Sequence, residues 1–464
     1  MRPRMSRMTA GRIIIDFETV EKRNAMIPKI YSVGQAVKLR VCRTEKFKTA
    51  MLSVSAVLPI RQESVWMTTL LLSVLRRGTE KYPTLEDLNR RLDYLYGTEL
   101  SIRNFYRGNN HVIGFSADLL SEAYLPQGED LIAEALDVMR QILFFPALDE
   151  NGLLQERYVK SEQIQQCDAI RALKNNPRAY AAERMREVLY AKEPCGALSL
   201  GTEDEVMAVS AKELTDYWRA WLKTLTLDCF YVGDGDPEPI CDRLRVAFSD
   251  LLCADAVPTP YQGPVELCAA DPVRRVDEAL EVGQGQLLLG LRTQTTLTDR
   301  EFYACMVYNE LLGTSPISKL FMNVRERLSL CYHCSSTYHA HNGAILIHCG
   351  LSRVNRRAAE DEILRQIEQL KQGEISDEEL RAAKYSLRNA YLQIEDSPAA
   401  LESFYFSRAM AGVTDSAADC RARFARITRE DVVAVAQKMA LDTVYYLDGL
   451  LDNGEEETDD GTDA

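Results

Sequence analysis

Histidine is scarce in this sequence, with five in 464 residues, none before His111 and four of them within residues 333–348. A metal motif built on two histidines is therefore excluded from the first hundred residues. No apolar run reaches the roughly 20 residues that a membrane-spanning helix needs. No stripe of basic residues interleaved with aromatic residues is present either, so neither a membrane nor a nucleic acid is expected as a partner.

A disulfide framework is also missing, because the twelve cysteines follow no regular spacing. Such a pattern is typical of reduced thiols and predicts a cytoplasmic protein. The apolar run at residues 13–15 is too short for a signal peptide, so residues 1–27 are expected to form an N-terminal extension. Half of the formal net charge of −14 lies near the C-terminus. Residues 449–464 are therefore expected to be a disordered acidic tail.

Residues 28–253 alternate between strand and helix patterns in a definite order. The predicted elements are a strand from about residue 47, an apolar helix at Ser64–Leu75, a helix capped by Thr84, a hairpin at 100–118, a helix at 129–144, a polar helix from near Asp149 that is broken at Asn176-Pro177, a helix capped by Ser210, and a strand at Leu227–Val232.

Residues 277–448 repeat this order after an irregular, proline-rich linker at 254–276. Ser376 caps the second long helix, and Ser397-Pro398 breaks it, as Asn176-Pro177 breaks the first. Thr428 caps the last helix, as Ser210 does. The simpler alternative is that any chain with mixed elements alternates in this way. The recurrence of the broken helix favours a duplication, and the order of elements favours the α+β class.

Several motifs carry a resemblance to a known family. L-F-M-N-V-R-E-R-L-S-L-C-Y at residues 320–332, R-R-G-T at 76–79 and Y-P-T-L-E-D-L at 82–88 are similar to segments of the M16 (insulinase/pitrilysin-like) peptidases. The resemblance covers residues 28–448 and implies two tandem domains, each a mixed or antiparallel sheet with helices packed on one side. It is closest to an inactive bacterial branch, labelled as EF-P 5-aminopentanol modification-associated proteins or probable inactive metalloproteases.

The same resemblance shows what this chain has lost. The family's His-x-x-Glu-His motif falls on Thr69, Leu72 and Ser73, and its third zinc ligand falls on Gln163. Leucine offers no lone pair, and a neutral amide is a poor zinc ligand. We therefore expect no zinc, no other cofactor and no peptidase activity from this chain on its own.

Two family residues are retained in the second half. The resemblance implies that Arg325 and Tyr332 bind substrate by donating hydrogen bonds to peptide carbonyl oxygens, which suits a guanidinium and a phenol. Ser329 replaces the usual glycine between them, which costs about 1 kcal/mol if that position has a positive φ. The alternative is that Arg325 pairs with a surface carboxylate and Tyr332 packs in a strand.

The remaining cysteine and histidine residues are the one candidate for a replacement metal site. Cys331 and Cys334 lie near His333, His339, His341, His348 and Cys349. Because residues three apart on a strand face opposite sides, we expect the two sulfurs to diverge and to be ordinary thiols. Cys195 is likewise expected to be a structural residue rather than a nucleophile.

These observations favour a non-catalytic subunit of a heterodimeric zinc metallopeptidase. A zinc-bearing M16 homologue would be its partner, and a peptide or unfolded polypeptide would be the substrate. One alternative is a structural or peptide-binding scaffold without a peptidase role. Another is an autonomous enzyme that uses the cysteine and histidine cluster.

Overall fold

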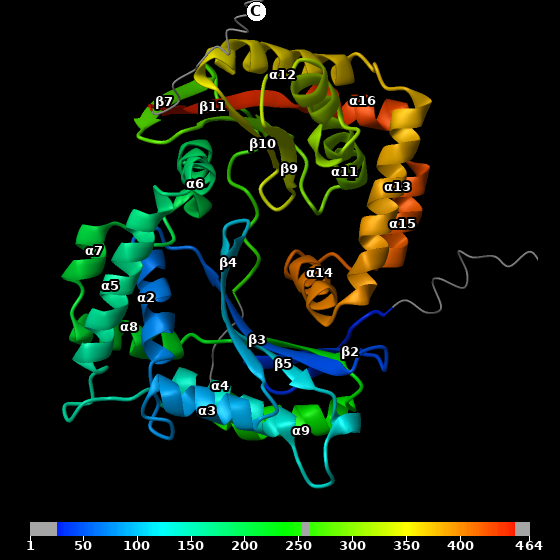
Figure 1. Cartoon of the computed structure of the whole chain (residues 1–464). Coiled ribbons are helices and arrows are strands. Elements are labelled where there is room, and N and C mark those ends of the chain that lie inside the picture. The colour runs from blue at the N-terminus through cyan, green and yellow to red at the C-terminus, as the bar shows by residue number, and fades with distance from the viewer. Residues whose placement is uncertain (1–25, 253–258, 451–464) are drawn as a thin grey trace, which may run out of the picture.

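Two sheets face each other across the molecule, each formed by one half of the chain (Figure 1). The computed structural model describes residues 26–252 and 259–450, so most of the N-terminal extension and residues 451–464 of the expected acidic tail lie outside the described residues. Gly449, which was expected to begin the tail, is instead the last residue of a strand. Within these ranges, no helix combines the length and the apolar character needed to cross a membrane.

The first sheet has six strands in the order β1-β2-β6-β3-β5-β4. Only β2 and β6 run parallel, and every other neighbouring pair is antiparallel. The strands are β1 (Lys29–Ser32), β2 (Val37–Arg43), β3 (Thr49–Pro59), β4 (Glu99–Arg107), β5 (Asn110–Leu120) and β6 (Leu227–Gly233).

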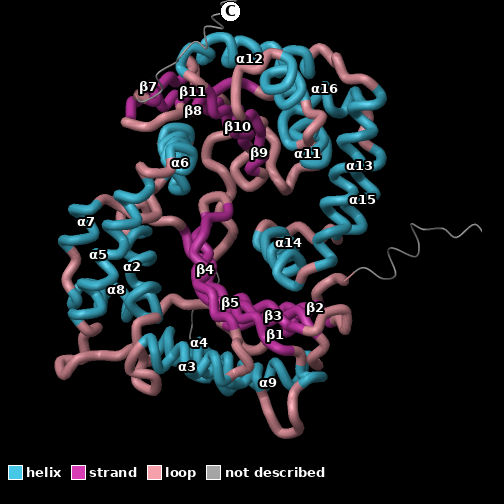
Figure 2. Tube along the Cα trace, viewed as in Figure 1, coloured by secondary structure: helices cyan, strands magenta, loops and turns pink. Residues whose placement is uncertain are grey.

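Helices of the first half cover one face of this sheet and flank it on one side (Figure 2). In that view α3, α4 and α9 lie below the sheet, and α2, α5, α7 and α8 gather to its left. Their bounds are α2 (Val65–Leu75), α3 (Leu85–Tyr94), α4 (Leu131–Phe144), α5 (Glu156–Leu173), α7 (Glu203–Ala208), α8 (Ala211–Leu222), α9 (Pro237–Ala247) and α10 (Ser249–Leu252).

The second sheet has five strands in the order β7-β11-β8-β10-β9, with β7 parallel to β11 and the other pairs antiparallel. The strands are β7 (Arg274–Leu280), β8 (Gly285–Arg292), β9 (His333–His339), β10 (Ala344–Leu351) and β11 (Ala440–Gly449). The helices that pack with it are α11 (Phe302–Asn309), α12 (Arg356–Lys371), α13 (Asp377–Gln393), α15 (Ala417–Arg426) and α16 (Arg429–Lys438). The α+β class and the two-domain arrangement are thus confirmed.

Side-chain caps begin the helices where the sequence predicts them. Thr84 accepts a hydrogen bond from the backbone N–H of Asp87. Ser210, Ser376 and Thr428 each form a complete capping box with the acidic residue three positions later. Each cap satisfies backbone donors that the first helical turn leaves free, which stabilises the helix by about 1 kcal/mol.

The two broken helices lead to an exchange between the halves. Asn176 and Ser397 cap α6 (Pro177–Leu189) and α14 (Pro398–Met410), and each helix has a proline at its start. Helix α6 packs on β8 and β11 of the second sheet, while α14 packs on β3 and β6 of the first. Both helices therefore lie between the sheets, as Figure 1 shows.

Close approach of α6 depends on a glycine in the second sheet. A Cβ on Gly290 would lie 2.6 Å from Met185 Cε and 3.0 Å from Leu189 Cδ1. Leu288 and Tyr445 join Met185 in a buried cluster there. On the other side, Phe230 and Phe406 belong to a cluster between α14 and the first sheet. Each half thus completes the apolar core of the other.

The structure also corrects several boundaries. The long helix predicted from Asp149 begins at Glu156, because the Asp149 carboxylate accepts hydrogen bonds from the N–H groups of Asn151 and Leu153 and forms a turn. Strand β7 begins at Arg274, within the last residues of the predicted linker. Strands β1, β2 and β7 and helices α7, α9, α10 and α15 were not predicted at all.

Candidate functional site

The helix that would carry a zinc motif is an ordinary structural helix. Leu72 on α2 is 1% exposed and belongs to the main core of the first half. Thr69 donates to the carbonyl of Ser199 at 2.8 Å and accepts from the Asn104 amide at 3.0 Å. The Asn104 oxygen in turn contacts Nε2 of His111 at 2.5 Å. The Thr69 hydroxyl is therefore fully engaged in hydrogen bonds within the protein.

Gln163 on α5 also has a structural role. Its amide donates two hydrogen bonds, to the carbonyls of Val206 at 2.7 Å and Val209 at 2.8 Å. It thereby fixes the end of α7 rather than presenting its oxygen to a metal. The neighbouring Glu162 forms an ion pair with Arg77. Thr69, Leu72 and Gln163 therefore do not fit a zinc ion, and residues 26–252 and 259–450 contain no group of three or more metal-ligating side chains placed to hold one.

Arg325 lies on a wide helical turn, the π-helix η4 (Phe321–Arg327), which follows a second π-helix, η3 (Glu310–Thr314). Its guanidinium lies 4.7 Å from the centre of the Phe321 ring and 3.7 Å from the carboxylate of Glu326. Both the Arg325 and Glu326 side chains are about half exposed. An exposed pair at this distance contributes only about 0–1 kcal/mol, so Arg325 remains available to other acceptors.

The chain turns sharply between Arg325 and Tyr332. Ser329 has a φ of +49°, the left-handed conformation in which glycine is favoured. The backbone of Ser329 is therefore strained. After the turn, the Tyr332 N–H donates to the carbonyl of Gly350 at 2.9 Å, and the Tyr332 side chain is 66% exposed.

Arg325 and Tyr332 border the same open cavity, whose volume is about 430 Å³. The cavity is lined by Arg325, Glu326, Ser329, Leu330, Cys331, Tyr332, Ser352 and Asn355. The turn at Ser329 brings both side chains to one space although seven positions separate them. A guanidinium and a phenol at the rim of one cavity present hydrogen-bond donors to a carbonyl or carboxylate group.

The prediction that the sulfurs of Cys331 and Cys334 diverge is wrong. Strand β9 begins only at His333, so Cys331 precedes the strand and does not follow its alternation. The Cys331 side chain instead packs against the core cluster that contains Cys334 and Cys349. Ser329 could have indicated the later start of the strand, because a position where the family usually has glycine is typical of a turn, and this one lies just before Cys331.

The nearby histidines are held in neutral contacts. Nε2 of His348 contacts the Gln286 side-chain oxygen at 2.9 Å, and His341 contacts Tyr261 and Ser407. Burial lowers the pKa of His348 to about 3 and that of His341 to about 4. Neither ring is therefore protonated near neutral pH.

Cys195 is buried, and its sulfur accepts a hydrogen bond from the Asn342 amide at 3.2 Å. Burial raises the pKa of the Cys195 thiol to about 12. A thiol that stays protonated at neutral pH is a poor nucleophile. These properties support a structural role for Cys195.

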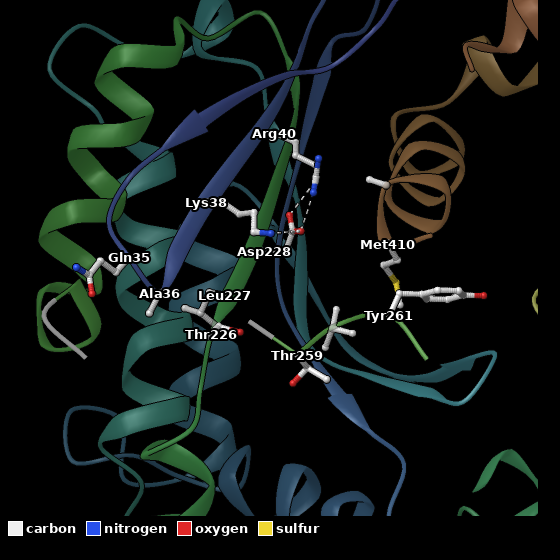
Figure 3. A pocket seen from close by; sticks show the side chains of 12 residues that line it. Gln35, Ala36, Lys38, Arg40, Thr226, Leu227, Asp228, Thr259, Tyr261 and Met410 are labelled. Carbon is white, nitrogen blue, oxygen red and sulfur yellow. Dashed lines mark hydrogen bonds and ion pairs between the residues drawn. The ribbon is translucent and has the colours of Figure 1, made fainter. Parts of the chain in front are cut away.

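A smaller cavity of about 100 Å³ lies between the first sheet and the end of α14 (Figure 3). Arg40 makes two hydrogen bonds of 3.0 Å to the carboxylate of Asp228, and Lys38 lies 3.9 Å from the same group. Met410 and Tyr261 close the opposite side. Both cations of the wall thus share the one carboxylate of Asp228, and the cavity lies where α14 packs on the first sheet.

Comparisons with known proteins agree on a family. A family model described as "Peptidase M16 inactive domain" matches residues 208–387. The probable inactive metalloprotease YmfF of Bacillus subtilis is 30% identical over 413 residues, which cover 88% of this chain and 95% of that protein. The uncharacterized zinc protease SCO5738 of Streptomyces coelicolor is 26% identical over 315 residues, or 65% of this chain and 66% of that protein.

Two further likenesses concern assembly and fold. The mitochondrial-processing peptidase subunit beta of Saccharomyces cerevisiae is 23% identical over 359 residues, covering 73% of this chain and 74% of that protein. The crystal structure of a conserved protein from Enterococcus faecalis V583 superposes with a TM-score of 0.82 at 26% identity, covering 92% of this chain and 99% of that one.

Proposed function

The chain belongs to the peptidase M16 family as an inactive member, and from that premise we propose that it is the non-catalytic subunit of a two-chain zinc peptidase. A zinc-bearing M16 homologue would supply the metal and the general base. This chain would supply part of the chamber wall and the donors of Arg325 and Tyr332. A peptide or an unfolded polypeptide would be the substrate.

One observation carries the proposal: Arg325 and Tyr332 are exposed at one cavity, in a chain whose zinc-motif positions have become structural. Arg325 has a weak contact with Glu326 and lies over Phe321. Turning it towards a peptide carbonyl would therefore cost little.

The likeness to a protein named as a subunit supports the proposed assembly. In a pair in which one chain supplies the zinc site, the other chain could lose its own zinc ligands and keep its hydrogen-bond donors to the substrate. In such a pair, donors aimed at a carbonyl that gains negative charge lower the barrier for its hydrolysis.

The test is peptide cleavage by the zinc-bearing homologue mixed with variants of this chain. Arg325→Ala removes a charged donor, which is worth about 1.5–3 kcal/mol, so kcat/KM of the mixture should fall about 10- to 100-fold. Arg327→Ala is the matched control, since Arg327 lies on the same turn and pairs with Glu362 at 3.7 Å. It should leave kcat/KM within about twofold.

Tyr332→Phe tests the second donor and removes only the hydroxyl. Tyr385→Phe is its control, because Tyr385 on α13 is similarly exposed at 62%. Co-purification of each variant with the homologue separates loss of assembly from loss of cleavage. Equal effects of Arg325→Ala and Arg327→Ala, with assembly intact, would count against substrate contact and favour a scaffold.

A further inference from the structure

Three thiols converge beside the cavity that Arg325 and Tyr332 border. Cys334 on β9 and Cys349 on β10 are direct register partners, and both are buried in the core of the second half. Side chains paired in this way lie about 4.5–5.5 Å apart at Cβ. Cys331 precedes β9, packs against the same core and lines the cavity.

The three cysteines differ in access. Cys331 is half-buried and reaches the cavity, whereas Cys334 and Cys349 are 4% and 0% exposed. An external reagent therefore meets Cys331 first. Cys334 and Cys349 lie in the core against which Cys331 packs, so they are the thiols next to the modified sulfur.

The surroundings favour negative charge on the accessible sulfur. The neighbouring thiols of Cys334 and Cys349 favour the thiolate form of Cys331, and the positive charge of Arg325 acts in the same direction. Together they lower the pKa of Cys331 to about 4, against the opposing effect of burial. Hydrogen bonding to Cys331 raises the pKa of Cys334 and of Cys349. The nucleophilic thiolate is thus placed where solvent reaches it.

We propose that Cys331 is a peroxide-reactive cysteine and that Cys334 or Cys349 closes a disulfide with it. A low-pKa, accessible thiol next to a second thiol is the arrangement found in redox-sensing cysteines. The inference goes beyond the proposed subunit role and requires no partner chain.

The chemistry balances with a peroxide as the oxidant. The Cys331 thiolate attacks one peroxide oxygen, the O–O bond breaks, and the leaving oxygen takes up a proton to form water or an alcohol. Cys331 is then a sulfenic acid. A neighbouring thiol loses its proton and attacks that sulfur, the S–O bond breaks, and water leaves. Two thiols are oxidised to one disulfide, and one peroxide is reduced.

The disulfide would alter the cavity directly. It removes the thiolate beside Arg325 and ties the start of β9 to the sheet core. Tyr332 lies between Cys331 and the first residue of β9, so its backbone would be held at both ends. Oxidation therefore acts on the segment that carries the exposed donors.

Peptide mapping after treatment with hydrogen peroxide tests the proposal on the full chain. Trypsin releases Leu328–Arg353 as one fragment that contains all three cysteines. After mild oxidation this fragment should be two hydrogens lighter and should keep one alkylatable thiol instead of three. Cys331→Ser should abolish this change. The Cys334→Ser, Cys349→Ser double variant should stop at a sulfenic acid on Cys331 that dimedone captures.

Cys268 is the internal control, because it is an exposed thiol in the loop before β7. Oxidation of Cys268 ahead of Cys331 would overturn the proposal. Iodoacetamide labelling of the unmodified chain provides a second readout that needs no variant. Cys331 should react equally fast at pH 6 and pH 8, whereas an ordinary thiol reacts many-fold faster at pH 8. A Cys331 rate that rises with pH as the Cys268 rate does would likewise overturn it.

Discussion

Arg103 on β4 donates a hydrogen bond of 3.1 Å to the carboxylate of Glu402 on α14, across 299 positions of the sequence. Ser53 donates to the other carboxylate oxygen at 2.9 Å, and the Phe406 ring lies 5.2 Å from the guanidinium. On the second sheet, Arg292 forms a buried ion pair of 2.8 Å with Glu193, which follows α6. Both sheets are therefore joined to the opposite half through a buried charge.

Glu402→Ala should be strongly destabilising. It leaves the Arg103 guanidinium, 8% exposed, without its carboxylate, and removing one partner of a buried pair costs about 3–5 kcal/mol. Urea denaturation should show a lower midpoint. Glu86→Ala is the control, since Glu86 pairs with Arg90 on the exposed face of α3. It should change the free energy of unfolding by less than about 0.5 kcal/mol. Equal costs for the two variants would contradict the buried pair.

Gln163→Glu should also destabilise the chain, and zinc should not restore it. The change replaces an amide that donates to two carbonyls with a carboxylate that faces them, at a cost of about 3 kcal/mol. Gln165→Glu on the exposed side of α5 should be nearly neutral. Thermal unfolding with added zinc or with a chelator should give the same midpoint for both variants. A gain in stability with zinc in Gln163→Glu would show that this position can hold a zinc ligand and would contradict its structural role.

The stability of the fold should fall in acid partly through His111. Burial lowers its folded-state pKa from 6.5 to about 4, so the unfolded chain binds more protons between these values. Stability from this group is complete above pH 6.5 and is lost as the pH falls towards 4, by about 2 kcal/mol at pH 5. His111→Gln should therefore lose less stability than the natural chain between pH 7.5 and pH 5. Parallel losses in urea denaturation would show that His111 contributes nothing to the pH dependence.

Ser329→Gly should stabilise the turn between Arg325 and Tyr332. A serine at a φ of +49° is strained, and glycine relieves this strain at some cost in the entropy of the unfolded chain. The net gain in the free energy of unfolding should be about 0.5–1 kcal/mol. Ser335→Gly within β9 should lose a similar amount, since glycine weakens a strand. Two changes of the same sign would contradict the assignment of strain to Ser329.

The sequence predicted those helix starts that depend on residues close together in the chain. The caps at Thr84, Ser210, Ser376 and Thr428 were predicted because an oxygen side chain and its backbone donor lie three positions apart. The start of α5 was misplaced because Asp149 forms a turn of its own before Glu156. A polar turn and the polar face of a helix contain the same kinds of residue. The sequence pattern therefore did not distinguish the turn at Asp149 from the start of α5.

The exchange of α6 and α14 could not be predicted from periodicity. Met185 and Phe406 indicate apolar helix faces, but nothing local shows that each face meets the sheet of the other half. The convergence of Cys331, Cys334 and Cys349 was missed for a related reason. It depends on where β9 begins and on the register of β9 with β10, which brings together residues far apart in the chain.

Peptide cleavage tests the proposed role as a complementing subunit, measured for this chain alone, for a zinc-bearing M16 homologue alone and for the two mixed. We predict activity only in the mixture, abolished by a chelator that removes the homologue's zinc and reduced about 10- to 100-fold by Arg325→Ala in this chain. A homologue that cleaves equally fast with and without this chain would contradict this role.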